Sequence, residues 1–499
     1  MRCAPTGPGA KATIRKPPCG NIRSASPKKG APPPMVSRSS SNSTRRSRTR
    51  SSSPPRATGS CAASDAVRPP KGHKPTAYRP CARLTRSACR CQWRSAPESL
   101  EMMMSKHVLE KLAETNPECE IWWDSSPLVF PSWKEETLAA APEGKRADWE
   151  AQLTRFYDPA NPAEMGFRGV TTNPPLSLQA VQLDPQGWRQ LVLDIAKADK
   201  ALDVEGVYWQ MYLQLVKKGA DAILPAFKAS GGKYGMLSGQ VDPRFVTDGE
   251  AMLAQGLSIA EMGENVMVKL PGSKEGYEVL EELTARGIST NNTTSFAVAQ
   301  YSRCMAAVTA GLQRAKAAGV DLTNWRSVIT HMSSRLGEKG DWKLEAKLRG
   351  IDLSVDEIRD GEEAVLKRAY WYGKNSGHPS KMLQCSMRVE KDKDGNTVSR
   401  HIQDFAGGDF VYTCPPGYIK QLMDVEDELA PFDPKAIERE PNKASIEKLM
   451  KLPSFRQAYE FEGMKPHEFA SYGSFMATAT EFAAATRQTV DFVRSVVEG

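Results

Sequence analysis

Eight short apolar runs, separated by amphipathic helical segments, constrain the fold of this chain more than any other feature. The runs are residues 120–124, 168–173, 236–241, 266–270, 287–291, 327–331, 382–386 and 409–413. Such alternation is typical of parallel β/α units. In one intervening helix, Tyr277, Leu280 and Leu283 recur at helical spacing, and Gly287 follows as a C-terminal stop. Eight units in about 310 residues fit a (β/α)8 TIM barrel, which typically takes about 250 residues or more.

A doubly wound open sheet would give the same alternation, so the loops must separate the two folds. No run opens onto a GxGxxG or GxxxxGK[ST] phosphate-binding loop. This disfavours nucleotide binding, and we predict an α/β protein with a (β/α)8 barrel. Beyond Pro431 there is no further strand pattern, and residues 445–452 and 481–497 have the pattern of helices.

The chain therefore divides into three predicted parts. Residues 1–100 form a disordered basic extension, residues 101–430 the catalytic barrel, and residues 431–499 a helical cap on the barrel.

The first hundred residues differ sharply in composition from the rest. They hold 21 Lys and Arg against Asp65 and Glu98, whereas the remaining residues carry 46 basic against 57 acidic side chains. They also contain 15 prolines and 16 serines and few large apolar residues, so they should not fold alone. No run approaches the roughly 18 apolar residues that span a bilayer.

A basic, Ser-rich segment with little acid is typical of an organellar transit peptide, and we expect plastid targeting. Two alternatives stay open. Arg45, Arg46, Arg48 and Arg50 could contact nucleic acid phosphates. Translation could instead start near Met102, which would leave the protein in the cytoplasm.

Polar residues stand at the ends of the predicted strands, where a TIM barrel places its active site. Lys269 is the most informative of them. The alternation in residues 266–270 turns Lys269 toward the barrel axis. Burial lowers the pKa of an ammonium group, and a neutral amine can attack a carbonyl to form a Schiff base. A buried structural Lys paired with a carboxylate, for which Asp124 is the candidate, is an equally good interpretation from these residues alone.

Two long segments match the signatures of one enzyme family. Residues 166–178, GFRGVTTNPPLSL, resemble the strand-two signature of transaldolases, and residues 266–300 resemble the signature that carries the Schiff-base lysine of that family. The resemblance covers roughly residues 118 to 497. It implies a barrel enzyme that moves a dihydroxyacetone unit from a ketose phosphate to an aldose phosphate, in the pentose phosphate pathway and without a cofactor.

The resemblance also implies roles for individual residues. Lys269 is similar to the Schiff-base lysine and Asp124 to the acid/base of carbon–carbon cleavage. Thr293 matches a threonine that helps hold the catalytic water, with Gln240 at the other water-binding position. The residues that we expect to bind substrate are Thr171, Asn173, Asn291, Thr330, Arg335, Ser386 and Arg388, with the two arginines on the sugar phosphate.

Two positions depart from the transaldolase pattern. Gln240 stands where transaldolases have a glutamate, and an amide can orient water but cannot take its proton. The glutamine resembles the fructose-6-phosphate aldolase branch of the superfamily, and Thr330 replaces a common serine. An aldolase that releases the three-carbon ketone, and a barrel that binds sugar phosphates with little turnover, therefore remain alternatives.

The histidines and cysteines suggest no metal site and no serine-type nucleophile. His107, His331, His378 and His467 form no triad or HExxH pattern. We expect sugar phosphates as substrates, no metal, no nucleic acid and no membrane partner, with a homodimer as one option for the assembly.

Overall fold

A computed structural model of the chain describes residues 105–499. The predicted basic extension, residues 1–100, lies outside the described residues.

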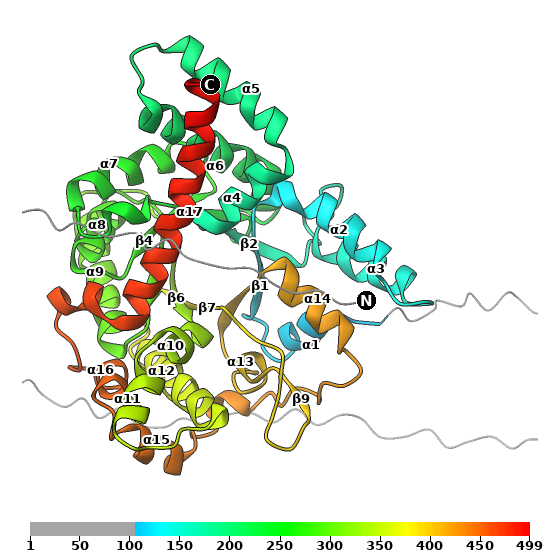
Figure 1. Ribbon diagram of the computed structural model, residues 1–499, viewed down its shortest axis with the longest axis vertical. Helices are drawn as coiled ribbons and strands as arrows, with labels where there is room; N and C mark the ends of the chain where they lie inside the picture. Colours follow the sequence, from blue (N-terminus) through cyan, green and yellow to red (C-terminus); the bar gives the residue numbers. More distant parts are fainter. Residues whose placement is uncertain (1–104) are drawn as a thin grey trace, which may run out of the picture. The chain divides into compact units, whose positions relative to one another are not determined.

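Eight parallel strands close into a barrel, which confirms the predicted fold (Figure 1). Around the barrel the strand order is β1-β10-β7-β6-β5-β4-β3-β2, so each strand lies beside its sequence neighbour in the barrel and β10 closes onto β1. The barrel strands are β1 (Glu120–Asp124), β2 (Phe167–Thr171), β3 (Met236–Gln240), β4 (Val266–Pro271), β5 (Thr290–Ser295), β6 (Ser327–Met332), β7 (Lys381–Cys385) and β10 (Phe410–Cys414).

The predicted bounds of the fifth strand were wrong. The prediction placed it at residues 287–291, but Gly287 has φ +76°, a left-handed conformation that ends helix α8 (Lys274–Ala285). Strand β5 starts at Thr290 and has the sequence TNNTTS. Its polar side chains hid it from a search for apolar runs, because strands are usually recognised by apolar residues.

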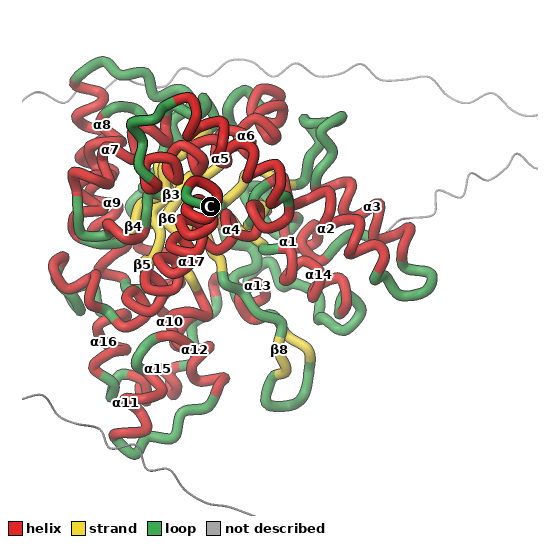
Figure 2. Tube along the Cα trace, turned by 45° about the horizontal axis from the view of Figure 1, so that its top comes forward, coloured by secondary structure: helices red, strands yellow, loops and turns green. Residues whose placement is uncertain are grey.

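Helices surround the barrel, as Figure 2 shows around the yellow strands. Apart from α8 and the helices of the C-terminal region, they are α1 (Val108–Ala113), α2 (Phe130–Ala139), α3 (Arg146–Phe156), α4 (Pro174–Leu183), α5 (Pro185–Ala198), α6 (Val204–Ala229), α7 (Gly249–Ala260), α9 (Val298–Ala317), α10 (Ser333–Lys339), α11 (Trp342–Leu348), α12 (Val355–Asn375), α13 (Arg400–Gln403) and α14 (Pro416–Asp424). The described helices include none that is both long and apolar enough to cross a membrane.

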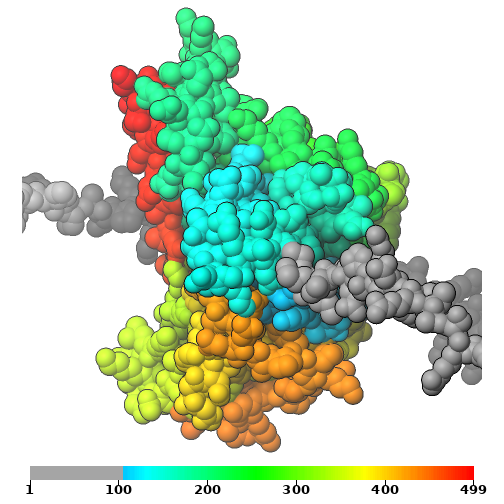
Figure 3. Space-filling view, turned by 90° about the vertical axis from the view of Figure 1, so that its right-hand side faces the viewer, coloured from blue at the N-terminus to red at the C-terminus, as the bar shows by residue number. Residues whose placement is uncertain are grey.

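The C-terminal region is helical, as predicted, and its last helix lies across the barrel. It contains α15 (Lys443–Leu449), α16 (Pro453–Tyr459) and α17 (Gly473–Val497). Helix α17 contacts α4, α5, α6, α10 and strand β5, and is red in Figure 1. From the side, α17 lies along the part of the surface formed by α5 and α6 (Figure 3). This helix therefore spans elements from both halves of the barrel.

A short β-hairpin, which the sequence analysis did not predict, follows β7. Its strands are β8 (Glu390–Lys391) and β9 (Thr397–Val398), which pair antiparallel. Two-residue strands carry too little periodicity to be recognised from sequence.

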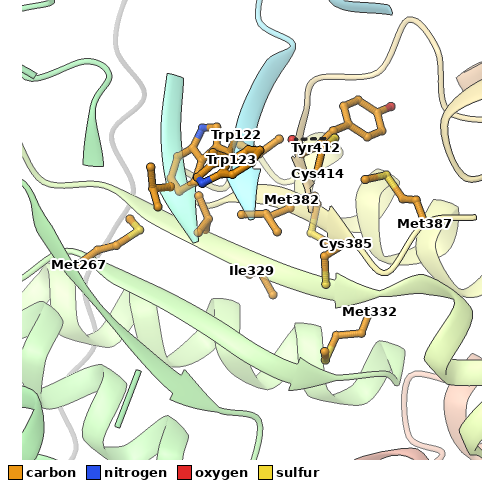
Figure 4. Packing of buried hydrophobic residues seen from close by; sticks show 14 of the residues in the cluster. Trp122, Trp123, Met267, Ile329, Met332, Met382, Cys385, Met387, Tyr412 and Cys414 are labelled. Carbon is orange, nitrogen blue, oxygen red and sulfur yellow. Dashed lines mark hydrogen bonds between the residues drawn. The ribbon is translucent and has the colours of Figure 1, made fainter. Parts of the chain in front are cut away.

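Inside the barrel, a tryptophan fills the space beside a glycine. Trp122 on β1 is fully buried, and Figure 4 shows its side chain reaching from β1 toward the neighbouring strand. Its Nε1 donates to Glu120 at 2.9 Å. A Cβ atom at Gly169 on β2 would lie 2.5 Å from Cδ2 of Trp122. The indole ring therefore occupies the volume that a side chain at residue 169 would need.

Gly169→Ala should destabilise the protein by about 1–3 kcal/mol, because the indole ring or the β2 backbone must shift to admit the methyl group. Urea unfolding followed by circular dichroism measures the loss. Gly417→Ala is the matched control, since a Cβ atom there would have no described atom within 4 Å apart from its chain neighbours and the backbone of its own helix. Equal stability of Gly169→Ala and the wild-type protein would contradict this packing.

Candidate functional site

A cavity of about 470 Å³ lies at the C-terminal ends of the barrel strands. The structure brings most of the predicted site residues together around it: Asp124, Thr171, Asn173, Lys269, Thr330, Arg335, Ser386 and Arg388. Three predicted residues, Gln240, Asn291 and Thr293, do not line this cavity. The chemical roles assigned to all of these residues stay predictions.

Lys269 enters the cavity from β4 and is almost completely buried, with 4% of its surface exposed. Its Nζ donates to the backbone carbonyl of Thr172 at 2.9 Å. Burial lowers the pKa of Lys269 below its ordinary value, and the charge of Asp124 opposes part of this shift. A carbonyl oxygen orients the amine without neutralising a charge, so this environment favours the neutral, nucleophilic form.

Asp124, at the end of β1, is buried and hydrogen-bonded within the same cavity. Its Oδ1 accepts from Thr171 Oγ1 at 2.6 Å, and Thr171 lies 2.6 Å from Thr413 Oγ1. Burial raises the pKa of Asp124, while Lys269 and the hydrogen bond from Thr171 act in the opposite direction. A carboxyl group with a raised pKa can both accept a proton and hold it, as an acid/base requires.

Asn173 caps helix α4 where strand β2 ends. Its side-chain oxygen accepts from the Leu176 amide at 3.1 Å, which fixes the start of the helix. The capping contact uses one lone pair of Oδ1 and leaves the two N–H donors of Nδ2 free for a ligand in the cavity.

Asn291 lies below the cavity and orients a residue that lines it. Its Nδ2 donates to Ser238 at 3.0 Å, and its Oδ1 accepts from Thr330 at 2.7 Å. Asn291 is fully buried, whereas Thr330 lines the cavity. In this conformation Asn291 acts on the cavity through Thr330.

Gln240 and Thr293 each have a buried side-chain oxygen without a described hydrogen-bond partner. In the described residues, neither Gln240 Oε1 nor Thr293 Oγ1 has a hydrogen-bond partner. Gln240 pairs in register with Lys269 and lines a much smaller cavity beside the main one, which Thr486 of α17 also lines. Buried polar atoms without protein partners are commonly satisfied by ordered water.

The two predicted phosphate-binding arginines lie at the cavity mouth, and each contacts a carboxylate. Arg335 on α10 forms two hydrogen bonds with Glu481 of α17, at 3.0 and 2.9 Å. Arg388, in the loop after β7, contacts Glu338 at 3.1 Å and is about half exposed. The structure therefore places two guanidinium groups in the lining of the cavity.

The cavity also includes residues that the sequence analysis did not assign. Thr413 comes from the end of β10, and could have been found because it ends the eighth predicted strand. Cys385 lies with Met332 and Met387 near the ends of β6 and β7 (Figure 4). Lys339, Glu481 and Phe482 reach the cavity from α10 and α17, and no local pattern placed them there.

Two strand ends at the site have unusual backbone geometry. In the described part of the chain, the non-glycine residues with positive φ are Thr294 (52°) and Ser386 (59°). Thr294 follows Thr293 on β5, and Ser386 directly follows β7. Left-handed conformations of such residues carry strain and concentrate at functional sites.

The described residues contain no cluster of three or more His, Cys, Asp or Glu side chains arranged to hold a metal ion. Cys119, Cys304, Cys385 and Cys414 are all free thiols.

Comparison with known proteins points to one family. The family model described as Transaldolase/Fructose-6-phosphate aldolase matches residues 160–466. Transaldolase 1 of Streptomyces avermitilis is 36% identical over 178 residues, which cover 35% of this chain and 46% of that protein. Transaldolase 2 of the same species is 33% identical over 269 residues, or 51% of this chain and 71% of the relative. Transaldolase 2 of Nostoc punctiforme is 28% identical over 282 residues, which cover 52% of this chain and 72% of that protein.

The alignment with the first of these relatives thus spans less than half of that relative's length. The family match itself covers more than half of this chain and includes strands β2 to β10 with Lys269. Because this match falls on the strands that form the cavity, the chain belongs to the transaldolase/fructose-6-phosphate aldolase family.

Proposed function

We propose that the protein is a transaldolase, which transfers a dihydroxyacetone unit between sugar phosphates through a Schiff base on Lys269. The observation that carries the proposal is the buried Lys269 amine, with its lowered pKa, in the same cavity as the Asp124 carboxyl group. Family membership and the arginines at the cavity mouth support it.

In the proposed reaction, neutral Lys269 attacks the ketone carbon of the donor, and loss of water gives an imine. Asp124 takes the proton of the donor hydroxyl as the carbon–carbon bond breaks, and the bonding electrons move into the protonated imine to give an enamine. The aldehyde product leaves. The enamine then adds to the acceptor aldehyde, Asp124 returns the proton to the new hydroxyl, and water releases the ketose product.

The second candidate is an aldolase of the fructose-6-phosphate type, and Gln240 favours it. An amide at this position orients water without accepting its proton. If the enamine takes a proton on carbon before an acceptor adds, it becomes an imine again, and hydrolysis of this imine by water frees dihydroxyacetone and the Lys269 amine. The two activities therefore differ in their dependence on an acceptor sugar.

We also propose that residues 1–100 direct the protein to plastids, which their basic, Ser-rich and acid-poor composition supports. We further propose that two copies of the chain form a homodimer. The exposed apolar side chains of Leu344, Leu348 and Val355 are candidates for its interface. Sedimentation velocity measures the assembly state directly.

With fructose 6-phosphate alone, release of dihydroxyacetone should be slow. Addition of erythrose 4-phosphate should start rapid formation of sedoheptulose 7-phosphate, because the enamine on Lys269 turns over by adding to the acceptor aldehyde. Chromatographic separation of the products measures both. Rapid dihydroxyacetone release that does not depend on the acceptor would instead establish the aldolase.

Lys269→Arg should abolish covalent trapping of the donor by borohydride, because a guanidinium group stays protonated and cannot form an imine. In the wild-type protein, trapping should increase as pH rises, with a midpoint below 10.5, since burial lowers the pKa of Lys269 and the neutral amine reacts. Mass spectrometry of the reduced adduct measures both results.

The control for this variant is Lys367→Arg, at a buried lysine that binds Glu363 and the Ala436 carbonyl. It should retain trapping. Trapping in Lys269→Arg would show that another lysine forms the Schiff base.

Residues 1–100 fused to a fluorescent protein should enter plastids in plant or algal cells, as microscopy would show. The same fusion with Arg45, Arg46, Arg48 and Arg50 replaced by Glu should remain outside. A wild-type fusion that stays in the cytosol would rule out the targeting role.

A further inference from the structure

The guanidinium group of Arg335, which we expect to bind the substrate phosphate, already contacts a carboxylate of the chain. Both carboxylate oxygens of Glu481 contact the Arg335 guanidinium, at 3.0 and 2.9 Å. Lys339 also contacts this carboxylate. All three side chains line the cavity that contains Lys269. Glu481 therefore uses the paired donors that a phosphate group would use.

Glu481 is charged at neutral pH. Burial alone would raise the pKa of Glu481, but hydrogen bonds from Arg335 and Lys339 bring it to about 2. A phosphate that binds Arg335 must therefore displace a carboxylate ion or bind close to it, and both cost binding free energy.

The Arg335 side chain has a second contact besides its carboxylate. The Arg335 guanidinium lies 5.5 Å from the ring centre of Phe482, which is buried on α17. Glu481, in contrast, is 39% exposed and can turn toward solvent. We therefore expect that rotation of the Glu481 side chain is enough to free the Arg335 guanidinium for another anion.

A sugar without a phosphate group leaves the contact between Glu481 and Arg335 intact. When no phosphate is present, Glu481 keeps the largely buried Arg335 charge paired, which avoids the cost of an unpaired charge. Substrates without phosphate therefore bind with Glu481 in place, whereas phosphorylated substrates bind only against its competition.

We propose that Glu481 determines substrate specificity by competing with the substrate phosphate for Arg335 and Lys339. This inference rests on the proposed function, since it assumes that sugar phosphates bind in this cavity. It predicts that loss of the carboxylate charge shifts preference toward phosphorylated substrates.

The test measures the binding of inorganic phosphate by calorimetry, which needs no catalysis. Glu481→Gln should bind phosphate about tenfold more tightly than the wild-type protein, or about 1.4 kcal/mol. Asp491→Asn is the matched control: it removes one acidic charge from an exposed position of the same helix, about 15 Å along its axis. The control should bind phosphate as the wild-type protein does.

Two further variants separate competition from an indirect effect. Arg335→Ala should weaken phosphate binding, and adding Glu481→Gln to it should change the dissociation constant much less than in the wild-type background. Glu481→Asp keeps the charge but is one methylene too short for the paired contact, so it should tighten binding by a smaller factor. This variant serves as the test if Glu481→Gln does not fold, as judged by circular dichroism.

The kinetic counterpart uses the substrates themselves. In Glu481→Gln, KM for fructose 6-phosphate should fall, while KM for unphosphorylated fructose stays the same or rises. Unchanged or weaker phosphate binding in both Glu481 variants would overturn the inference. A protein that binds phosphate as expected but forms no Schiff base would leave the inference standing and refute the proposed function.

Discussion

The cost of burying the Lys269 amine determines how the groups around it are arranged. The ammonium form loses its hydration inside the barrel, where Nζ donates to the carbonyl of Thr172 and, within the described residues, forms no ion pair with a carboxylate. Asp124 is near enough to influence the charge of Lys269 but is itself hydrogen-bonded to Thr171. One cavity thus holds Asp124 with a raised pKa and Lys269 with a lowered pKa. Shifts in these directions favour the exchange of protons between the substrate and the two side chains.

The closed barrel makes this arrangement possible. Parallel strands bring their C-terminal ends to one side, so residues from β1, β2, β4, β6 and β7 meet although they are up to about 260 positions apart. Below them, Asn291 connects Ser238 to Thr330 by two hydrogen bonds. Helix α17 completes the site from the opposite direction and supplies the carboxylate that faces Arg335.

Much of the fold and part of the site could be predicted from residue patterns. The apolar strands and the spacing of the helices were recognisable because burial imposes a periodicity on each element. Strand β5 was displaced in the prediction because its side chains are polar on both faces. Lys269 and Asp124 stood out from their positions at predicted strand ends, whereas Arg335 and Arg388 were assigned through the resemblance to the transaldolase family.

The amino-acid sequence by itself determined the barrel, the order of its strands and the lysine directed to its axis, since these depend on local periodicity and chain order. The tertiary structure decided which of the polar residues face the cavity and which only support it, as for Asn291 and Gln240. It also decided that Glu481 faces Arg335, a residue 146 positions away. The pattern of α17 predicts a helix, but no local signal specifies where the helix lies, because its position depends on packing against α4, α5, α6 and α10.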